Sequence, residues 1–374
     1  KVPNSTAEQL WKFMETDLTE AITSGKLTSK TSLEDRDGGT RATLEAARCL
    51  LGKIYLYQEK YADAKSELEK VISSGKYDLI ADVSTFYHPA SAGCKEYVLE
   101  CVRHYDPSNM YSQEGWFGIL ANWGFGYGFI AGPEASMHYK FNTTSGYSYF
   151  NPSKSLYDAF VAEEGADGYR LNAWIRTWEQ VIAMNIAVNT TTNKYASEGY
   201  FRLKWLASTD DEFVGYWCGN QSNTPVIRYA DVLLMAAEAC LQAGDQAGAD
   251  EYLGRVRDRA RLPRKSHVTL SDIKLERRLE LAMEGMRFQD LKRWGDAPAV
   301  LADKGKKLPT FQIVPDPNND LTTAAGIYNA RYTTKTTYVD NEKSLAGWTP
   351  NRDEWLPFPE NELEVNSNLK QNPG

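Results

Sequence analysis

The stretch Glu276–Gly295, ERRLELAMEGMRFQDLKRWG, decides the fold of this chain of 374 residues. Its apolar residues recur every three or four positions, which predicts one long amphipathic helix whose buried stripe includes Leu279 and Met286. Thr269 and Asp272 have the spacing of a capping box, so we expect the helix to begin there. A helix of this kind needs other helices against which to bury its stripe.

The carboxylates of this stretch allow two interpretations. Glu280 and Glu284 stand one helical turn apart, a spacing at which paired carboxylates can act in acid/base catalysis. Arg277 and Arg287 lie three residues from Glu280 and Glu284 respectively, within reach of an ion pair on a helix surface. Ion pairs along the helix therefore explain the pattern without catalysis. We therefore predict that Glu284 and Arg287 form structural ion pairs.

Two helix pairs are predicted on either side of the chain's middle. Residues 45–76 fit the 34-residue tetratricopeptide plan, with Gly52 at a small packing position and Leu68 at a large one. The plan recurs around residues 237–256, where Ala237 takes the place of Gly52. A further helix is expected over residues 5–24, capped by Ser5 and Glu8, with an apolar stripe that starts at Leu10.

Three blocks of sequence carry a resemblance to a known family. They are Arg228–Ala239 (RYADVLLMAAEA), the helix Glu276–Gly295, and the ending Trp355–Leu363 (WLPFPENEL) with Asn366–Gly374. In this order they resemble the SusD/RagB family, surface lipoproteins of Bacteroidetes that capture nutrients, usually glycans, beside a TonB-dependent outer-membrane transporter. The resemblance implies a mainly α, SusD-like fold with tetratricopeptide helix pairs and an irregular, aromatic-rich insertion. It also implies that a signal peptide, a lipid-bearing cysteine and further helices lie ahead of Lys1.

The pattern along the chain divides it into four segments of one compact unit. Residues 1–90 form a helical segment with the first tetratricopeptide pair, and 91–225 an irregular insertion with the candidate ligand site. Residues 226–300 hold the second pair and the long helix. The proline- and asparagine-rich residues 301–374 are expected to wrap back as an extended strap.

The insertion is unusually rich in aromatic residues, with thirteen between Tyr105 and Phe150. In Gly124–Phe129 glycine alternates with aromatic residues, so an extended backbone would place its rings on one face. Such a surface suits stacking against sugar rings, with amides at its rim. Most of the thirteen rings are expected to pack as core. The candidate ligand-binding residues are Trp116, Trp123, Tyr127, Tyr111, Asn122 and Trp217.

Composition excludes several other classes of protein. The net charge of −8 argues against nucleic-acid binding. No phosphate loop, nucleophile motif or metal-ligand spacing occurs, so no metal or cofactor is expected. Among the five cysteines, Cys94 and Cys101 are placed to pair in an oxidising compartment.

The resemblance implies a function for the whole protein. It is non-catalytic binding of an oligosaccharide or polysaccharide at the extracellular face of the outer membrane, with delivery to a SusC-like TonB-dependent transporter. Contact with the membrane would come only through a lipid anchor outside this chain. Two alternatives stay open: a peptide-capturing member of the same superfamily, and a scaffold that binds only the transporter. Of the functions considered, enzymatic activity is the least supported hypothesis.

Overall fold

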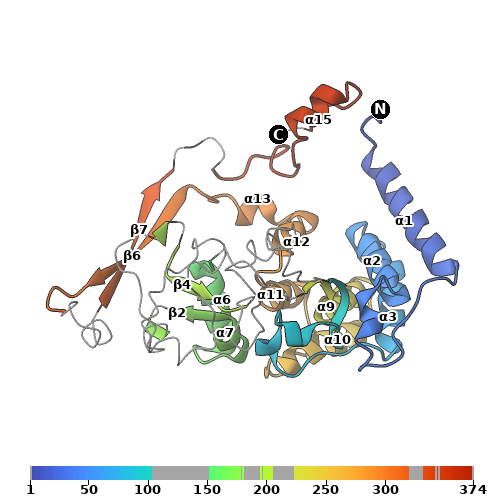
Figure 1. Cartoon of the computed structure of the whole chain (residues 1–374), viewed down its shortest axis with the longest axis horizontal. Helices are drawn as coiled ribbons and strands as arrows, with labels where there is room; N and C mark the ends of the chain where they lie inside the picture. The colour runs from blue at the N-terminus through green and yellow to red at the C-terminus, as the bar shows by residue number, and fades with distance from the viewer. Residues whose placement is uncertain are drawn as a thin grey trace, which may run out of the picture.

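The chain is mainly helical in the computed structural model, which describes residues 2–102, 151–177, 179–180, 194–195, 197–204, 223–319, 332–341, 343 and 346–372. Two helix pairs lie together in the body of the molecule, while a strand pair and a long hairpin lie to one side of them (Figure 1). This arrangement confirms the predicted mainly α fold.

The first predicted helix pair is present as α2 (Leu44–Tyr57) and α3 (Tyr61–Ser73). The turn between them bends through Glu59, whose φ of 60° lies in the left-handed region. Gly52 faces Leu68 so closely that a Cβ atom added to the glycine would lie 2.8 Å from the leucine Cγ. The two helices therefore touch through the small residue that the tetratricopeptide pattern predicts.

The second predicted pair is α9 (Tyr229–Gln242) and α10 (Gln246–Arg259). Gly244 has a φ of 83°, which lets the chain reverse between the two helices. Ala237 and Leu253 are fully buried where the pair meets. Helix α3 packs against α9, so the two helix pairs share one apolar core.

Helix α9 forms the centre of that core, because every residue from Tyr229 to Cys240 is buried. Two of these residues, Asp231 and Glu238, carry carboxylates into otherwise apolar surroundings. Arg277 donates to Asp231 at 2.8 Å, and Arg293 donates to Glu238 at 2.7 Å. Charge pairing therefore fixes where the stretch Glu276–Gly295 lies on α9.

That stretch is not one helix, which corrects the prediction. Helix α11 spans Leu270–Glu280, and a separate helix, α12, spans Arg287–Arg293. Between them Met283 and Gly285 have φ values of 64° and 81°, a conformation that no α-helix can contain. The apolar periodicity continues across the break because both helices bury apolar residues, Leu279 in α11 and Leu291 in α12, and periodicity alone does not detect the break.

The start of α11 agrees with the sequence. Thr269 is its N-cap, and the hydroxyl of Thr269 and the carboxylate of Asp272 satisfy each other's backbone N–H groups. Burial alone would raise the pKa of Asp272, but hydrogen bonds from the Thr269 hydroxyl and the Lys265 ammonium hold this pKa at about 2. The Asp272 carboxylate of the capping box is therefore ionised at neutral pH.

We expect Thr269→Ala to lower the free energy of unfolding by about 1 kcal/mol at neutral pH. The pKa of Asp272 is lower in the folded state than in the unfolded chain, so its contribution is complete above about pH 4 and is lost as the pH falls towards 2. Urea unfolding at neutral pH measures the loss of stability in Thr269→Ala. Urea unfolding of the wild type and Asp272→Asn over a range of pH measures the contribution of Asp272, because the two stabilities should converge towards low pH. A difference that is constant with pH would contradict the assignment.

Helix α1 spans Ala7–Thr23 and begins one residue later than predicted. The N-cap is Thr6 rather than Ser5, and the capping box closes with Gln9 rather than Glu8. Both pairs have the spacing of a capping box, so the sequence alone did not distinguish their registers.

The apolar stripe expected on α1 is only partly covered. Leu10 and Phe13 are 49% and 63% exposed, while Met14, Leu18 and Ala21 are half-buried. Polar contacts also hold the helix against the first pair, since Glu15 accepts hydrogen bonds from Gln58 at 2.7 Å and from Lys60. The exposure of Leu10 and Phe13 differs from the prediction that this stripe is buried.

Short elements connect the helical body to the insertion. Strand β1 (Tyr97–Cys101) pairs antiparallel with β5 (Thr224–Arg228), and β2 (Ile175–Thr177) pairs antiparallel with β4 (Tyr200–Arg202). The remaining short elements are α6 (Lys154–Glu164), α7 (Tyr169–Trp174), α13 (Ala297–Val300), η1 (Asp37–Thr40), η2 (Val83–Thr85) and η3 (Pro89–Ser91).

The C-terminal segment contains more regular structure than the predicted extended strap. Strands β6 (Lys307–Pro315) and β7 (Tyr332–Asp340) form a nine-pair antiparallel hairpin, and β3 (Lys194–Tyr195) adds to β6. The short helix α15 (Glu360–Val365) follows, near the N-terminus of the chain (Figure 1). Asn4 and Lys370 exchange two hydrogen bonds there, so the two ends of the chain meet.

Candidate functional site

The predicted ligand residues lie outside the part of the chain that the structure describes. Five of them fall in residues 103–150 and one in residues 205–222. Their assignment therefore stays a prediction. The set is Trp116, Trp123, Tyr127, Tyr111, Asn122 and Trp217. The described residues at the ends of these two segments show what holds the insertion to the body.

Lys204 immediately precedes the segment 205–222 and is fully buried at its ammonium end. Its Nζ donates to the backbone carbonyls of Glu280 and Ala282, each at 3.1 Å, and to the Glu284 carboxylate at 2.6 Å. The ammonium also lies 3.8 Å from the ring centre of Trp174, a cation–π contact. Burial lowers the pKa of Lys204 to about 8, against the opposing effect of Glu284.

Asn223 follows the same segment and fixes its other end. Its amide donates to the Glu100 carboxylate at 3.0 Å, and the other oxygen of Glu100 accepts the backbone N–H of Gly93 at 2.8 Å. Glu100 lies on β1, which residues 103–150 follow. One hydrogen-bonded pair therefore joins the stems of both segments that carry the candidate ligand residues.

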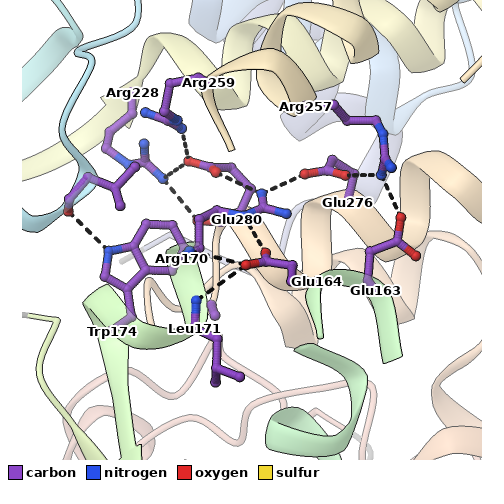
Figure 2. Close-up of polar contacts among 12 residues, drawn as sticks. Glu163, Glu164, Arg170, Leu171, Trp174, Arg228, Arg257, Arg259, Glu276 and Glu280 are labelled. Atoms are coloured by element: carbon purple, nitrogen blue, oxygen red, sulfur yellow. Dashed lines mark hydrogen bonds and ion pairs between the residues drawn. The ribbon is translucent and has the colours of Figure 1, made fainter. Parts of the chain in front are cut away.

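Beneath these stems the structure contains a cluster of buried charges, centred on Glu280. Arg170 and Arg228 donate to its two carboxylate oxygens at 3.0 and 3.1 Å, and Arg259 donates as well (Figure 2). Burial alone would raise the pKa of Glu280, but the guanidiniums of Arg259, Arg228 and Arg170 hold this pKa well below its usual range. The buried charge cluster comprises Glu96, Glu164, Arg170, Lys204, Arg228, Arg257, Arg259, Glu276, Glu280 and Glu284.

Arg228 connects this cluster to β1 and to the helix break. It donates to Glu96 at 2.6 Å, to Glu284 at 2.6 and 2.9 Å, and to the backbone carbonyl of Glu280 at 3.1 Å. Its guanidinium also lies 4.6 Å from the ring centre of Phe86. Carboxylates, a backbone carbonyl and an aromatic ring thus contact this buried cation.

A second branch of the cluster joins α6 and α7 to α10 and α11. Arg170 donates to Glu164 at 2.7 Å and to Glu276 at 2.5 Å, and Arg257 joins Glu276 to Glu163 (Figure 2). Elements from the insertion and from the helical body therefore contribute charges to one buried cluster.

The ion pairs predicted along a single helix are corrected by this geometry. The described ion pairs of Glu284 are with Lys204 and Arg228, and none joins it to Arg287. Glu280 likewise pairs with arginines from other elements instead of Arg277. The break between α11 and α12 separates Glu284 from Arg287, which begins α12. Arg277 and Glu280 both lie in α11, but Arg277 is already paired with Asp231 and Asp290.

A local ion pair does occur within α12, where Arg293 lies 2.9 Å from Asp290, three residues earlier. The charged residues that sequence reasoning missed are Glu96, Arg170, Lys204 and Arg228. Apart from Glu164, which lies six residues from Arg170, their ion-pair partners lie 52 to 163 residues away, so local spacing does not report them. Asp231 and Glu238, which interrupt the apolar run of α9, do signal buried cations, but those cations are Arg277 and Arg293 and not these residues.

The carboxylates of the buried charge cluster are unsuited to acid/base catalysis. Glu276 and Glu280 have side chains that are 1% and 0% exposed, and each accepts from at least two arginines. A general base has to reach the proton it removes. This arrangement fits a structural base for the insertion.

One further group of side chains has metal-ligating chemistry among the described residues. Atoms of Glu69, Cys240 and Asp245 lie within 4.8 Å of one another. Lys65 pairs with Asp245 at 2.8 Å, and Tyr252 donates to Glu69 at 3.1 Å. Burial raises the pKa of the Cys240 thiol to about 12, so it does not offer a thiolate at neutral pH. These contacts join α3 to α9 and α10.

Two other sequence expectations can be compared with the described residues. Cys94 and Cys101 are free thiols in the structure, so the pairing considered from sequence does not occur in it. Within the described ranges, none of the helices has the length and apolar character needed to cross a bilayer.

Comparisons with known proteins place the chain in a family. The sequence profile described as the SusD family matches residues 95–374, more than half of the chain. SusD-like protein P2 of Formosa agariphila is 26% identical over 361 residues, which cover 88% of this chain and 59% of that protein. A SusD-like protein of Bacteroides ovatus is 42% identical over 77 residues, 19% of this chain and 14% of that protein. The chain thus spans less than two thirds of the length of these curated relatives.

Solved structures of similar fold cover nearly the whole chain. A laminarin-binding SusD-like protein is 27% identical, has a TM-score of 0.74, and matches 99% of this chain and 70% of its own. Surface glycan-binding protein A of Bacteroides thetaiotaomicron, in complex with laminarihexaose, is 24% identical with a TM-score of 0.72, and matches 100% of this chain and 72% of its own. The family is one of non-catalytic binding proteins. From the profile match and the shared fold, the chain belongs to the SusD family.

Proposed function

We propose that this chain binds an oligosaccharide or polysaccharide at the cell surface without transforming it. The observation that carries the proposal is the similarity over 99% of the chain to a protein described as laminarin-binding. The laminarihexaose complex of a second protein with the same fold adds support for a β-glucan ligand. Delivery to a SusC-like TonB-dependent transporter and attachment to the outer membrane by a lipid anchor are further parts of the proposal.

The candidate ligand residues supply the chemistry for such binding. Trp116, Trp123 and Tyr127 each have glycine within two positions, which leaves room for a ring to project towards a ligand. Aromatic rings stack on the apolar faces of pyranoses, and amides such as that of Asn122 bond hydroxyl groups at the rim. Each contact is weak, so we expect single-site dissociation constants on the order of micromolar to millimolar.

The buried charge cluster contributes rigidity to this mechanism. Lys204 and Asn223 hold the two ends of residues 205–222 through buried contacts, and Glu100 lies at the stem of residues 103–150. Loops whose stems are already fixed lose less conformational entropy when a ligand binds than loops that the ligand has to order. The cluster is therefore assigned to positioning the insertion, while the aromatic residues contact the ligand.

Affinity electrophoresis tests the proposal. The soluble chain is run through gels cast with laminarin, starch, xylan and pectin, beside Trp116→Ala, Trp123→Ala and a control, Trp355→Ala. Trp355 is 51% exposed and lies in the C-terminal segment, away from the proposed ligand residues in sequence. We expect laminarin to retard the wild type and the control, and to retard one or both of the other variants less.

Circular dichroism and the unfolding midpoint establish that the variants are folded. Equal retardation of all four proteins by laminarin would support glycan binding and move the site away from these two tryptophans. Passage of the folded wild type through every gel without retardation would overturn the proposal. Capture of peptides or binding to the transporter alone would then be the leading functions.

A further inference from the structure

The carboxylate of Glu198 lies beside tyrosines of the insertion and of the C-terminal hairpin. Tyr157 of α6 and Tyr200 of β4 stack with their ring centres 4.5 Å apart and their planes at 27°. Tyr338 of β7 donates its hydroxyl to Glu198 at 2.6 Å. Because 140 residues separate Tyr338 from Glu198, only the folded chain brings them together.

Glu198 is held from a second side. Its other carboxylate oxygen accepts the backbone N–H of Lys154 at 2.5 Å, in the first turn of α6. The negative charge therefore sits at a helix N-terminus, where the helix dipole favours it. A carboxylate fixed in this way keeps further lone pairs for hydroxyl donors. The bond to Glu198 also raises the pKa of Tyr338 to about 12, so Tyr338 donates throughout the physiological range.

The hairpin register places the ring of Tyr338 on a defined face. Tyr338 is opposite Pro309, and two positions along each strand Thr336 is opposite Phe311, so all four side chains share one face of the hairpin. Phe311 is buried on that face against the backbone of Gly199, where an added Cβ would lie 2.5 Å from the ring. The base of this face is thus packed core.

Tyr338 itself remains 49% exposed, although Pro309, Phe311 and Thr336 on this face are buried or partly buried. The result is a flat aromatic surface at the edge of the molecule, held rigid by the hydroxyl bond and backed by packed core. A ring that is fixed but uncovered has little entropy to lose when a flat ligand stacks on it.

We propose that Tyr338 and Glu198, beside the stacked Tyr157–Tyr200 pair, form a subsite for one neutral pyranose ring of the glycan. The apolar face of the sugar stacks on Tyr338, and its hydroxyl groups donate to Glu198. This inference rests on the proposed glycan-binding function. It adds a contact surface outside residues 103–150 and 205–222, which hold the residues predicted from sequence.

The charges around the subsite select the kind of sugar. Lys154 is paired with Asp158 at 2.6 Å, so its positive charge is already neutralised. Glu198 then leaves a net negative charge beside the ring. A uronic acid or a sulfated sugar would be repelled, whereas a neutral hexose would not.

Binding of laminarihexaose by the whole chain, measured by isothermal titration calorimetry, tests the subsite. We expect Tyr338→Ala to weaken binding by about 3- to 10-fold, the range for loss of one aromatic contact. Tyr338→Phe keeps the ring and should retain most of the affinity. Val339→Ala is the matched control, because Val339 is exposed on the same strand but on the opposite face.

The outcomes separate the subsite from the broader function. If the wild type binds laminarihexaose and Tyr338→Ala binds equally well, the subsite is overturned and the proposed function stands. If Tyr338→Ala and Tyr338→Phe lose affinity alike, the hydroxyl–carboxylate bond matters and ring stacking is overturned. If the folded wild type binds neither laminarihexaose nor any other neutral oligosaccharide, both proposals fail. Equal affinity for an oligouronate would overturn the predicted selection for neutral sugars.

Discussion

Replacing Arg228 with methionine should lower the free energy of unfolding by about 3–5 kcal/mol, the range for breaking a buried ion pair from one side. Methionine removes the donors to Glu96, Glu280 and Glu284 while filling much of the same volume. Three buried carboxylates would then share fewer cations, and water does not reach them to compensate. Urea unfolding followed by circular dichroism measures the change.

A surface arginine provides the matched control for this substitution. Arg264 pairs with Glu251 and Asp258, but its side chain is 45% exposed. Arg264→Met should therefore change stability by no more than about 1 kcal/mol. If Arg228→Met were as mild as Arg264→Met, the buried charge cluster would not be a main source of stability.

The second large effect is expected at Trp174, which lies under the stem of residues 205–222. Its indole N–H donates to the Val83 carbonyl at 3.1 Å, its ring packs edge-on against Phe160, and the Lys204 ammonium lies over its face. Trp174→Ala should cost about 3–5 kcal/mol, because it leaves a cavity in the core.

Trp174→Phe separates the packing of the ring from its hydrogen bond. It keeps an aromatic face for Lys204 but leaves the Val83 carbonyl without its donor, so we expect an intermediate loss of about 1–3 kcal/mol. The midpoint of thermal unfolding should fall in the order wild type, Trp174→Phe, Trp174→Ala. The reverse order of the two variants would contradict the packing described here.

The helix pairs were predictable from sequence because their contacts are local. Gly52 and Leu68 lie sixteen residues apart, so the pattern of small and large residues reports their packing directly. The capping box at Thr269 was predictable for the same reason. The break after Glu280 was not, because a residue such as Met283 adopts a positive φ only when its tertiary surroundings require it.

The candidate ligand residues likewise divide into those that local sequence indicates and those that it does not. Trp116 and Trp123 were selected by local composition, and their role is a prediction that the described residues do not test. The contact between Tyr338 and Glu198 was invisible to that reasoning, since neither residue stands in a conspicuous motif. Long-range pairs of this kind depend on how the hairpin packs against β4, which no short stretch of sequence encodes.

The end of α11 limits how the buried charge cluster can be redesigned. Buried ion pairs in other proteins can often be replaced by apolar residues of similar volume without loss of stability. Here the carbonyls of Glu280 and Ala282, left free where α11 stops, accept hydrogen bonds from Lys204 and Arg228. A wholly apolar core would remove these donors and leave backbone acceptors that no side-chain substitution can delete. Conversion to an apolar core would therefore require a different backbone between α11 and α12.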